Sequence, residues 1–175
     1  MRRHFILAYN SIEDTLSKLS EVVSTINAAL LLSHGIRRNV ELSIILVREQ
    51  AELRISGQYL RNYRPDYESA SGLLKKALIK GEVKGINLRR LRHNRIHITP
   101  DRTVLVINYR GIELISNLSK LYEERCKGIV IILPGADQYT SISDKCKVYH
   151  VSIGKNAYYE NQIIAILNIL LDNME

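Results

Sequence analysis

Three short segments of this 175-residue chain combine polar side chains with the end of an apolar run. They span residues 108–111, 133–137 and 152–156. Each follows a run rich in β-branched residues and leucine, which predicts a buried strand. In open parallel sheets small ligands bind at the carboxyl ends of the strands. Gly135 and Gly154 permit positive φ or a close backbone approach there, although glycine after a strand is also ordinary turn chemistry. The C-terminal half could therefore hold a small ligand.

The histidines and cysteines indicate no second chemical centre. His34 and His150 stand beside apolar segments without a visible partner, so we interpret them as structural residues. Cys126 and Cys146 lack the spacing of a metal site and are interpreted as packing residues. The sequence contains no P-loop, no dinucleotide-binding glycine motif and no Gly-x-Ser-x-Gly nucleophile turn. Acyl transfer, hydrolysis and metal catalysis thus receive no support, and no catalytic residue can be named.

Alternating strands and helices must position these segments. We expect strands at residues 4–9, 40–47, 103–108, 128–133 and 147–151, with possible short edge strands at 51–56 and 58–60. We expect helices at residues 12–33, 65–80, 112–125 and 158–172. Ser11 is the expected N-cap of the first helix, and Gly35 and Gly81 are expected to end the first and second helices. This alternation predicts one α/β domain over residues 1–175, with a mostly parallel sheet covered on both faces.

The charge of the chain points to a polyanionic partner. The net charge is +7, and nine of the 25 Lys and Arg residues lie between positions 75 and 102, where the acids are Glu82 and Asp101. Such clusters neutralise phosphates, which favours nucleic-acid binding. The alternative is the solvated surface of a thermophilic protein. No apolar run reaches the length of a membrane span, and two cysteines are too few for a disulfide scaffold, so we expect a cytoplasmic protein without a membrane partner.

The last expected helix suggests self-association. Between residues 163 and 171 it carries seven Ile and Leu residues, which wrap around more than one face. A helix of this kind must be buried on more than one side. We therefore expect a homodimer through the C-terminal helix, the alternative being a helix enclosed in the core of its own chain.

Four stretches of the chain share their residues with one family. They are 26–38 (Ile-Asn-Ala-Ala-Leu-Leu-Leu-Ser-His-Gly-Ile-Arg-Arg), 65–78 with its Leu-Leu-Lys-Lys-Ala-Leu helix, 84–91, and the C-terminal stretch of 151–153 with 161–172. They resemble the archaeal tRNA pseudouridine N1-methyltransferases of the SPOUT superfamily. The string Ser-His-x-Ile-Arg-Arg at 33–38 is the most specific part. The resemblance covers most of the chain.

This resemblance implies a fold, a cofactor and a set of contacts. The fold is a dimeric SPOUT-type methyltransferase domain with a C-terminal trefoil knot, and the methyl donor is S-adenosylmethionine. The implied donor-binding residues are Ile107, Leu133, Gly135, Ile153, Gly154, Lys155, Asn156, Ala157, Tyr158 and Ile163. The implied RNA contacts are Arg37, Arg38, Arg89 and Arg90, and the alternative role of these arginines is structural ion pairing.

The implied activity is methylation of N1 of a pseudouridine, with the tRNA T-loop as the favoured target and rRNA as the second. The chain departs from the family pattern at Gly35, which replaces an Asp, at Glu68, which replaces an Arg, and over residues 154–159. These departures leave open a catalytically inactive SPOUT relative that binds RNA or a protein partner. The strand pattern leaves open a second alternative, a nucleotide-binding α/β protein unrelated to methylation, although the chain contains no phosphate-binding motif.

Overall fold

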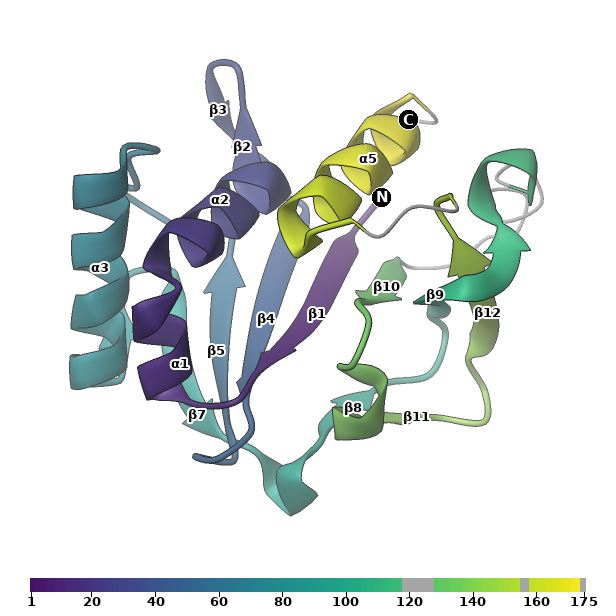
Figure 1. Cartoon of the computed structure of the whole chain (residues 1–175), viewed down its shortest axis with the longest axis horizontal. Coiled ribbons are helices and arrows are strands. Elements are labelled where there is room, and N and C mark those ends of the chain that lie inside the picture. Colours follow the sequence, from purple (N-terminus) through teal and green to yellow (C-terminus); the bar gives the residue numbers. More distant parts are fainter. Residues whose placement is uncertain (118–127, 155–157, 174–175) are drawn as a thin grey trace.

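A computed structural model of the chain describes residues 1–117, 128–154 and 158–173 (Figure 1). The helical elements are α1 (Ile12–Ser17), α2 (Leu19–Leu30), α3 (Tyr67–Lys80), α5 (Glu160–Asp172) and the 3-10 turns η1 (Arg92–Asn94) and η2 (Asp137–Tyr139). The strands are β1 (Arg3–Tyr9), β2 (Leu31–Leu32), β3 (Gly35–Ile36), β4 (Val40–Leu46), β5 (Ala51–Ser56), β6 (Glu82–Val83), β7 (Ile86–Arg90), β8 (Ile96–Ile98), β9 (Thr103–Glu113), β10 (Ile129–Ile132), β11 (Thr140–Ile142) and β12 (Lys147–Ser152). No helix in these ranges is long and apolar enough to cross a bilayer.

The main sheet has eight strands in the order β12-β9-β10-β1-β4-β5-β7-β6. From β12 to β4 all neighbours are parallel, and β5, β7 and β6 continue the sheet in antiparallel fashion. The predicted α/β fold with a mostly parallel sheet is therefore confirmed. Because β9, β10 and β12 run in the same direction, their carboxyl ends meet at one edge of the sheet.

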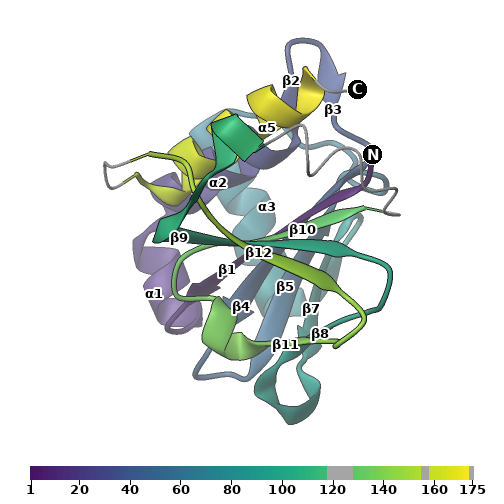
Figure 2. The same cartoon turned by 90° about the vertical axis from the view of Figure 1, so that its right-hand side faces the viewer.

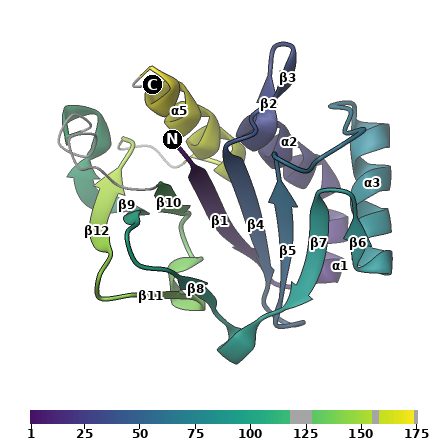
Figure 3. The same cartoon turned by 180° about the vertical axis from the view of Figure 1, so that it is seen from behind.

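Helices cover one face of this sheet. Figure 1 shows α1, α2 and α5 in front of the strands, and Figure 3, from behind, shows β1, β4, β5 and β7 with no described helix over them. Phe5, Leu7 and Tyr9 point to the helical face and belong to the main core together with residues of α2, α3 and α5. Helices α2 and α5 also pack against each other.

The opposite face of the sheet is divided into two parts. Ile6 and Val130 pack there against Ile96 and Ile98 of β8, which pairs with β11 in a short two-stranded sheet (Figure 2). Farther along, β4, β5 and β7 turn polar and charged residues to this face, namely Glu41, Ser43, Glu52, Arg54, Ser56 and Arg89. The expectation that the sheet is covered on both faces holds only in part for the described residues, because the second face is covered by β8, β11 and the η2 turn at one side and left open at the other.

The N-terminal helix differs from its prediction. Ser11 caps it as expected, since its hydroxyl accepts the Asp14 backbone N–H at 3.0 Å. The helix is interrupted at Lys18, however, where φ is −110° and ψ is 28°. The hydroxyls of Thr15 and Ser17 donate to the carbonyls of Ser11 and Asp14 just before the break. Such side-chain bonds compete with the helical ladder and bend helices. Helix α2, the second part of the predicted helix 12–33, ends at Leu30, because the β2–β3 hairpin begins there. The expectation that Gly35 ends this helix is therefore wrong, since Gly35 lies in β3.

The strand β9 is longer than predicted. It continues to Glu113, so the expected helix does not begin at Ile112; residues 114–117 are helical, and 118–125 lie outside the described residues. Gly111 explains the extension, because a Cβ there would lie 2.6 Å from backbone atoms of His150 and Val151. Residues 51–56 form an internal strand and not an edge strand, and 58–60 form a turn and not a strand.

Candidate functional site

A cavity of about 640 Å³ opens at the carboxyl ends of β9, β10 and β12. Its described walls consist of Val106, Ile107, Asn108, Tyr109, Arg110, Pro134, Gly135, Asp137, His150, Ser152, Ile153, Gly154, Tyr158 and Ile163. The volume falls within the range of small-molecule and cofactor sites. The position agrees with the rule that open α/β sheets bind ligands at the carboxyl ends of their strands.

Two loops that line the cavity depend on glycine conformations. Gly135 has a φ of 82°, a left-handed conformation that side chains with a Cβ rarely adopt. Gly154 has a φ of 147°, and a Cβ added there would lie 3.3 Å from the Tyr158 hydroxyl. The Ser152 hydroxyl fixes this second loop, since it donates to the Gly154 carbonyl at 2.9 Å and accepts the Gly154 N–H at 3.2 Å. The backbone around Gly154 is thereby held open toward the cavity.

The polar groups of the cavity carry both signs of charge. Asp137 begins the η2 turn after β10 and contributes a carboxylate. Arg110 contributes a guanidinium, which lies 5.3 Å from the centroid of the Tyr109 ring. Asn108 orders this segment, because its side-chain oxygen accepts the Arg110 backbone N–H at 2.8 Å. A site with apolar walls and two opposite charges suits a ligand with an apolar body and a zwitterionic end.

The predicted donor-binding residues are largely gathered in this cavity. Six of them line it, namely Ile107, Gly135, Ile153, Gly154, Tyr158 and Ile163. Leu133 does not line it; this side chain is 1% exposed and belongs to the main core just before Pro134. Lys155, Asn156 and Ala157 lie outside the described residues. That these residues bind S-adenosylmethionine stays a prediction.

The family resemblance did not supply every lining residue. Asn108, Tyr109, Arg110, Asp137 and Ser152 fall within the strand-end segments singled out from the sequence, but His150 was interpreted as structural. His150 lies where the pairing of β12 with β9 shifts register, between His150 and Val151. The sequence contains no local signal for this shift in register. The exposure of His150 to the cavity could therefore not be predicted. Among the described residues no three His, Cys, Asp or Glu side chains gather as a metal ion would require.

The four arginines predicted to contact RNA do not gather in one place. Arg37 pairs with Asp172 at 2.7 Å, and Arg38 donates to the backbone carbonyls of Gly57 and Leu60 at 3.0 and 3.3 Å. Arg89 pairs with the buried carboxylate of Glu52 at 2.5 Å. Arg90 is exposed. Arg38 and Arg89 line a second cavity on the face of the sheet away from the helices. RNA contact by these arginines stays a prediction.

Comparison with solved structures identifies the fold. The crystal structure of Archaeoglobus fulgidus Nep1 bound to S-adenosylhomocysteine matches with a TM-score of 0.65, over 99% of this chain and 99% of that chain. The two sequences are 11% identical, so the match shows a common fold alone. No family model matches the chain.

Comparison with curated sequences identifies partial relatives. The tRNA (pseudouridine(54)-N(1))-methyltransferase of Methanocella arvoryzae is 35% identical over 75 residues, which are 41% of this chain and 39% of the relative. Its namesake in Methanocorpusculum labreanum is 44% identical over 61 residues, 31% of each protein. The protein of that name in Haloferax volcanii is 37% identical over 65 residues, 37% of this chain and 32% of the relative. The chain thus spans well under half the length of the curated relatives it matches.

Proposed function

We propose that this chain is an S-adenosylmethionine-dependent RNA methyltransferase that methylates N1 of a pseudouridine. The favoured substrate is the T-loop of tRNA, and the second is rRNA. The observation that carries the proposal is the strand-end cavity, which brings together Ile107, Gly135, Gly154 and Ile163. These are positions at which the family resemblance implies the donor. The relatives that are named tRNA (pseudouridine(54)-N(1))-methyltransferase, and a fold shared with a structure that holds S-adenosylhomocysteine, add independent support.

The residues of the cavity fit such a donor. Ile107, Ile153 and Ile163 offer apolar surface for a nucleoside. Asp137 suits the positive groups of the ligand, and Arg110 suits its carboxylate. When bound, S-adenosylmethionine supplies a methyl group that its positive sulfur has already activated.

The protein must still align the base nitrogen with the methyl group and remove the N1–H proton. The cavity walls must hold the base nitrogen in line with the methyl group and exclude water. The N1–H proton of pseudouridine must also leave when the new N–C bond forms. Asp137 and His150 are the described lining residues whose side chains belong to the types that act as general bases.

Two finer features belong to the same proposal. We infer that the segment from β12 to α5 is threaded as a trefoil knot, which a crystal structure that traces the chain from residue 117 to residue 158 would test. We also infer a homodimer through α5, because Ile169 is 61% exposed on a helix that already buries Ile163, Ile164 and Leu167. Light scattering should give twice the chain mass, and Ile169→Glu should halve it. A monomeric wild-type protein would exclude the dimer.

Donor binding is the decisive test of the proposed function. Isothermal calorimetry should detect saturable binding of S-adenosylmethionine and of S-adenosylhomocysteine to the wild-type chain. Gly154→Leu should abolish it, because the new side chain meets Tyr158 and strains a φ of 147°. The matched control is Gly72→Leu on α3, since a Cβ at Gly72 has no atom within 4 Å. Absence of donor binding at saturating concentration would reject the methyltransferase.

A second candidate function is an RNA-binding relative without catalysis. The observation in its favour is the departure of residues 154–159 from the family pattern, which affects the loop after β12. This candidate predicts salt-dependent RNA binding without methyl transfer. Transfer of a labelled methyl group to a tRNA transcript that contains pseudouridine separates the two, because only the enzyme incorporates the label.

A further inference from the structure

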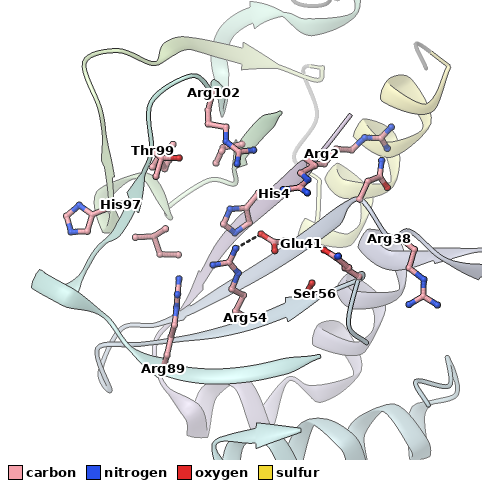
Figure 4. Close-up of a pocket in the computed structure, with 16 residues that line it drawn as sticks. Arg2, His4, Arg38, Glu41, Arg54, Ser56, Arg89, His97, Thr99 and Arg102 are labelled. Carbon is pink, nitrogen blue, oxygen red and sulfur yellow. Dashed lines mark hydrogen bonds and ion pairs between the residues drawn. The ribbon is translucent and has the colours of Figure 1, made fainter. Parts of the chain in front are cut away.

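The second cavity, of about 290 Å³, lies on the face of the sheet that the helices leave open (Figure 4). It is lined near the amino ends of β1, β4, β9 and β10 by residues such as His4, Glu41, Arg102 and Val130. The donor cavity lies at the carboxyl ends of the parallel strands instead. Val130 lines this cavity and Pro134 lines the donor cavity, so about four residues at 3.3 Å each, roughly 13 Å, separate the two along β10. The two sites are therefore distinct.

Strand alternation explains why this cavity is basic. Residues that pair across neighbouring strands point to the same face, as Ser43 does with Arg54 and Glu52 with Arg89. Arg2 joins them from the start of β1, and the arginines that line the cavity are Arg2, Arg3, Arg38, Arg54, Arg89 and Arg102. The single acidic residue in its described lining is Glu41. The guanidinium of Arg3 pairs with Asp172 of α5 instead, so the positive charge of this face comes from the other arginines, which the linear sequence spreads over a hundred residues.

Part of this charge is neutralised, and part is left for a ligand. Arg54 is paired with Glu41, and Arg89 is paired with Glu52. No ion pair or hydrogen bond to another described residue engages the guanidinium of Arg2 or Arg102. Figure 4 shows both of them directed toward His4 at the centre of the cavity. Two guanidinium groups that converge without a counter-ion form a site for an anion with several oxygens.

The floor of the cavity is held rigid by a buried hydrogen-bond chain. The Ser43 hydroxyl donates to Glu52 at 2.5 Å, so it must accept from Nε2 of His4, which lies 2.7 Å away. Arg89 Nε donates to the other Glu52 oxygen at 2.5 Å. Burial, followed by the charge of Arg54, lowers the pKa of His4 to about 4. His4 is therefore neutral at pH 7, and the positive charge of the cavity comes from its arginines.

One wall offers a further unused donor. The hydroxyl oxygen of Ser56 is buried and has no hydrogen-bond partner among the described residues. A buried polar group in this state gains from an acceptor that enters beside it. On the opposite wall lie His97 and Thr99, and the segment that leads into β8 carries the exposed Arg92 and Arg95. These two cations are the next ones along the chain from the cavity wall, so a polymer of phosphates could reach them.

We propose that this cavity seats a backbone phosphate of an RNA strand between Arg2 and Arg102, with the neighbouring phosphates along Arg92 and Arg95. The inference rests on the proposed function only for the identity of the polymer. It adds a contact on the open face of the sheet, remote from the donor cavity. The exposed Arg92 and Arg95, just before the β8 wall of the cavity, favour a strand of RNA over a free phosphate or a small phosphorylated metabolite.

The test compares two variants that remove the same charge. Arg2→Ala/Arg102→Ala should weaken binding of a full-length tRNA transcript by at least about tenfold and lower the salt slope of log K by about two. The control Arg48→Ala/Lys76→Ala removes two exposed cations outside the cavity and should change the affinity less than about threefold. Fluorescence anisotropy over a series of KCl concentrations measures both. Equal losses in the two variants would overturn the proposal.

Two further experiments are needed. One distinguishes an RNA phosphate from a small phosphate ligand, and the other distinguishes failure of this proposal from failure of the proposed function. Calorimetry with inorganic phosphate should show no saturable binding to the wild-type chain. Tight phosphate binding that Arg2→Ala/Arg102→Ala abolishes, with tRNA affinity unchanged, would overturn the RNA assignment in favour of a small ligand. Donor binding should be the same in wild type and in this variant. If neither binds the donor, the methyltransferase fails while the RNA result stands.

Discussion

Arg3 and Asp172 connect the first strand to the last helix, with Arg3 Nη1 2.6 Å from Asp172 Oδ1 across 169 positions of sequence. The Arg3 side chain is 1% exposed, and the second carboxylate oxygen of Asp172 accepts from Arg37 at 2.7 Å. Asn168 also accepts from Arg3 Nη1, at 3.0 Å. One carboxylate at the end of α5 thus neutralises two arginines from the N-terminal half.

We therefore expect Asp172→Ala to be destabilising. The buried Arg3 guanidinium loses one charged partner, whose own side chain is 37% exposed, and such a loss costs about 1–3 kcal/mol. The free energy of unfolding in urea, followed by circular dichroism, measures the loss. Glu13→Ala is the control, because the Glu13–Arg48 pair is long, at 3.6 Å, and Glu13 is 88% exposed. It should cost less than about 1 kcal/mol. Similar losses in both variants would contradict the structural role of Asp172.

Substitution of Gly111 and of Gly72 by alanine should change the stability of the chain in opposite directions. Gly111→Ala should destabilise the chain by about 1–3 kcal/mol, because its Cβ would overlap the backbone of β12. It should also weaken donor binding, since β9 and β12 frame the cavity. Gly72→Ala on the exposed side of α3 should instead stabilise the chain by about 0.5–1 kcal/mol. Thermal denaturation and donor calorimetry on both variants check the pair. A neutral Gly111→Ala would show that β12 is not packed against β9 as described.

His4 should make the free energy of unfolding depend on pH. Its pKa is about 4 in the folded chain against an ordinary value of 6.5, so the unfolded chain binds the proton more readily. The stability linked to His4 is complete above pH 6.5 and falls as the pH drops toward 4. The loss amounts to about 3 kcal/mol at most. Urea titrations at a series of pH values should show a steeper acid loss in wild type than in His4→Gln. Parallel curves would exclude the effect.

Asp137 should contribute to donor affinity. Its carboxylate is the acidic group in the described lining of the strand-end cavity, and it is placed to attract the positive groups of the ligand. Asp137→Asn should weaken binding of S-adenosylhomocysteine about tenfold or more, as expected for the loss of a charge-assisted contact. Asp144→Asn removes an exposed acid outside the cavity and serves as the control. Unchanged affinity in Asp137→Asn would remove this residue from the site.

Local signals made parts of the fold predictable. Helix α3 was predicted over residues 65–80 with Gly81 as its stop signal. The structure confirms the stop, with Gly81 in the left-handed region at a φ of 80°, and begins the helix at Tyr67, because the Asp66 carboxylate accepts the Ser69 N–H at 2.8 Å as an N-cap. The break at Lys18 and the length of β9 were missed. They depend on hydroxyl bonds to the backbone and on contact with a distant strand, which no short window of sequence contains.

The candidate site was predictable to a similar degree. The strand-end segments pointed to the donor cavity because parallel strands end together, and the family resemblance supplied its apolar walls. Arg89 and Arg90 illustrate what could not be predicted. They are neighbours in sequence, yet alternation turns Arg89 toward Glu52 on the open face while Arg90 pairs in register with Ala51 of the main core. The side of the sheet on which a cation lies depends on register, and register requires the whole sheet.

The short parallel pair of β8 and β11 connects a wall of the basic cavity to a wall of the donor cavity. Ile96 to Ile98 are in register with Thr140 to Ile142, and Thr140 directly follows the η2 turn that begins at Asp137. His97 of the same β8 strand lines the basic cavity. The strand that borders the basic cavity is thus hydrogen-bonded to the strand that follows the Asp137 turn of the donor cavity. The positions of His97 and Asp137 are therefore fixed by one and the same pair of strands.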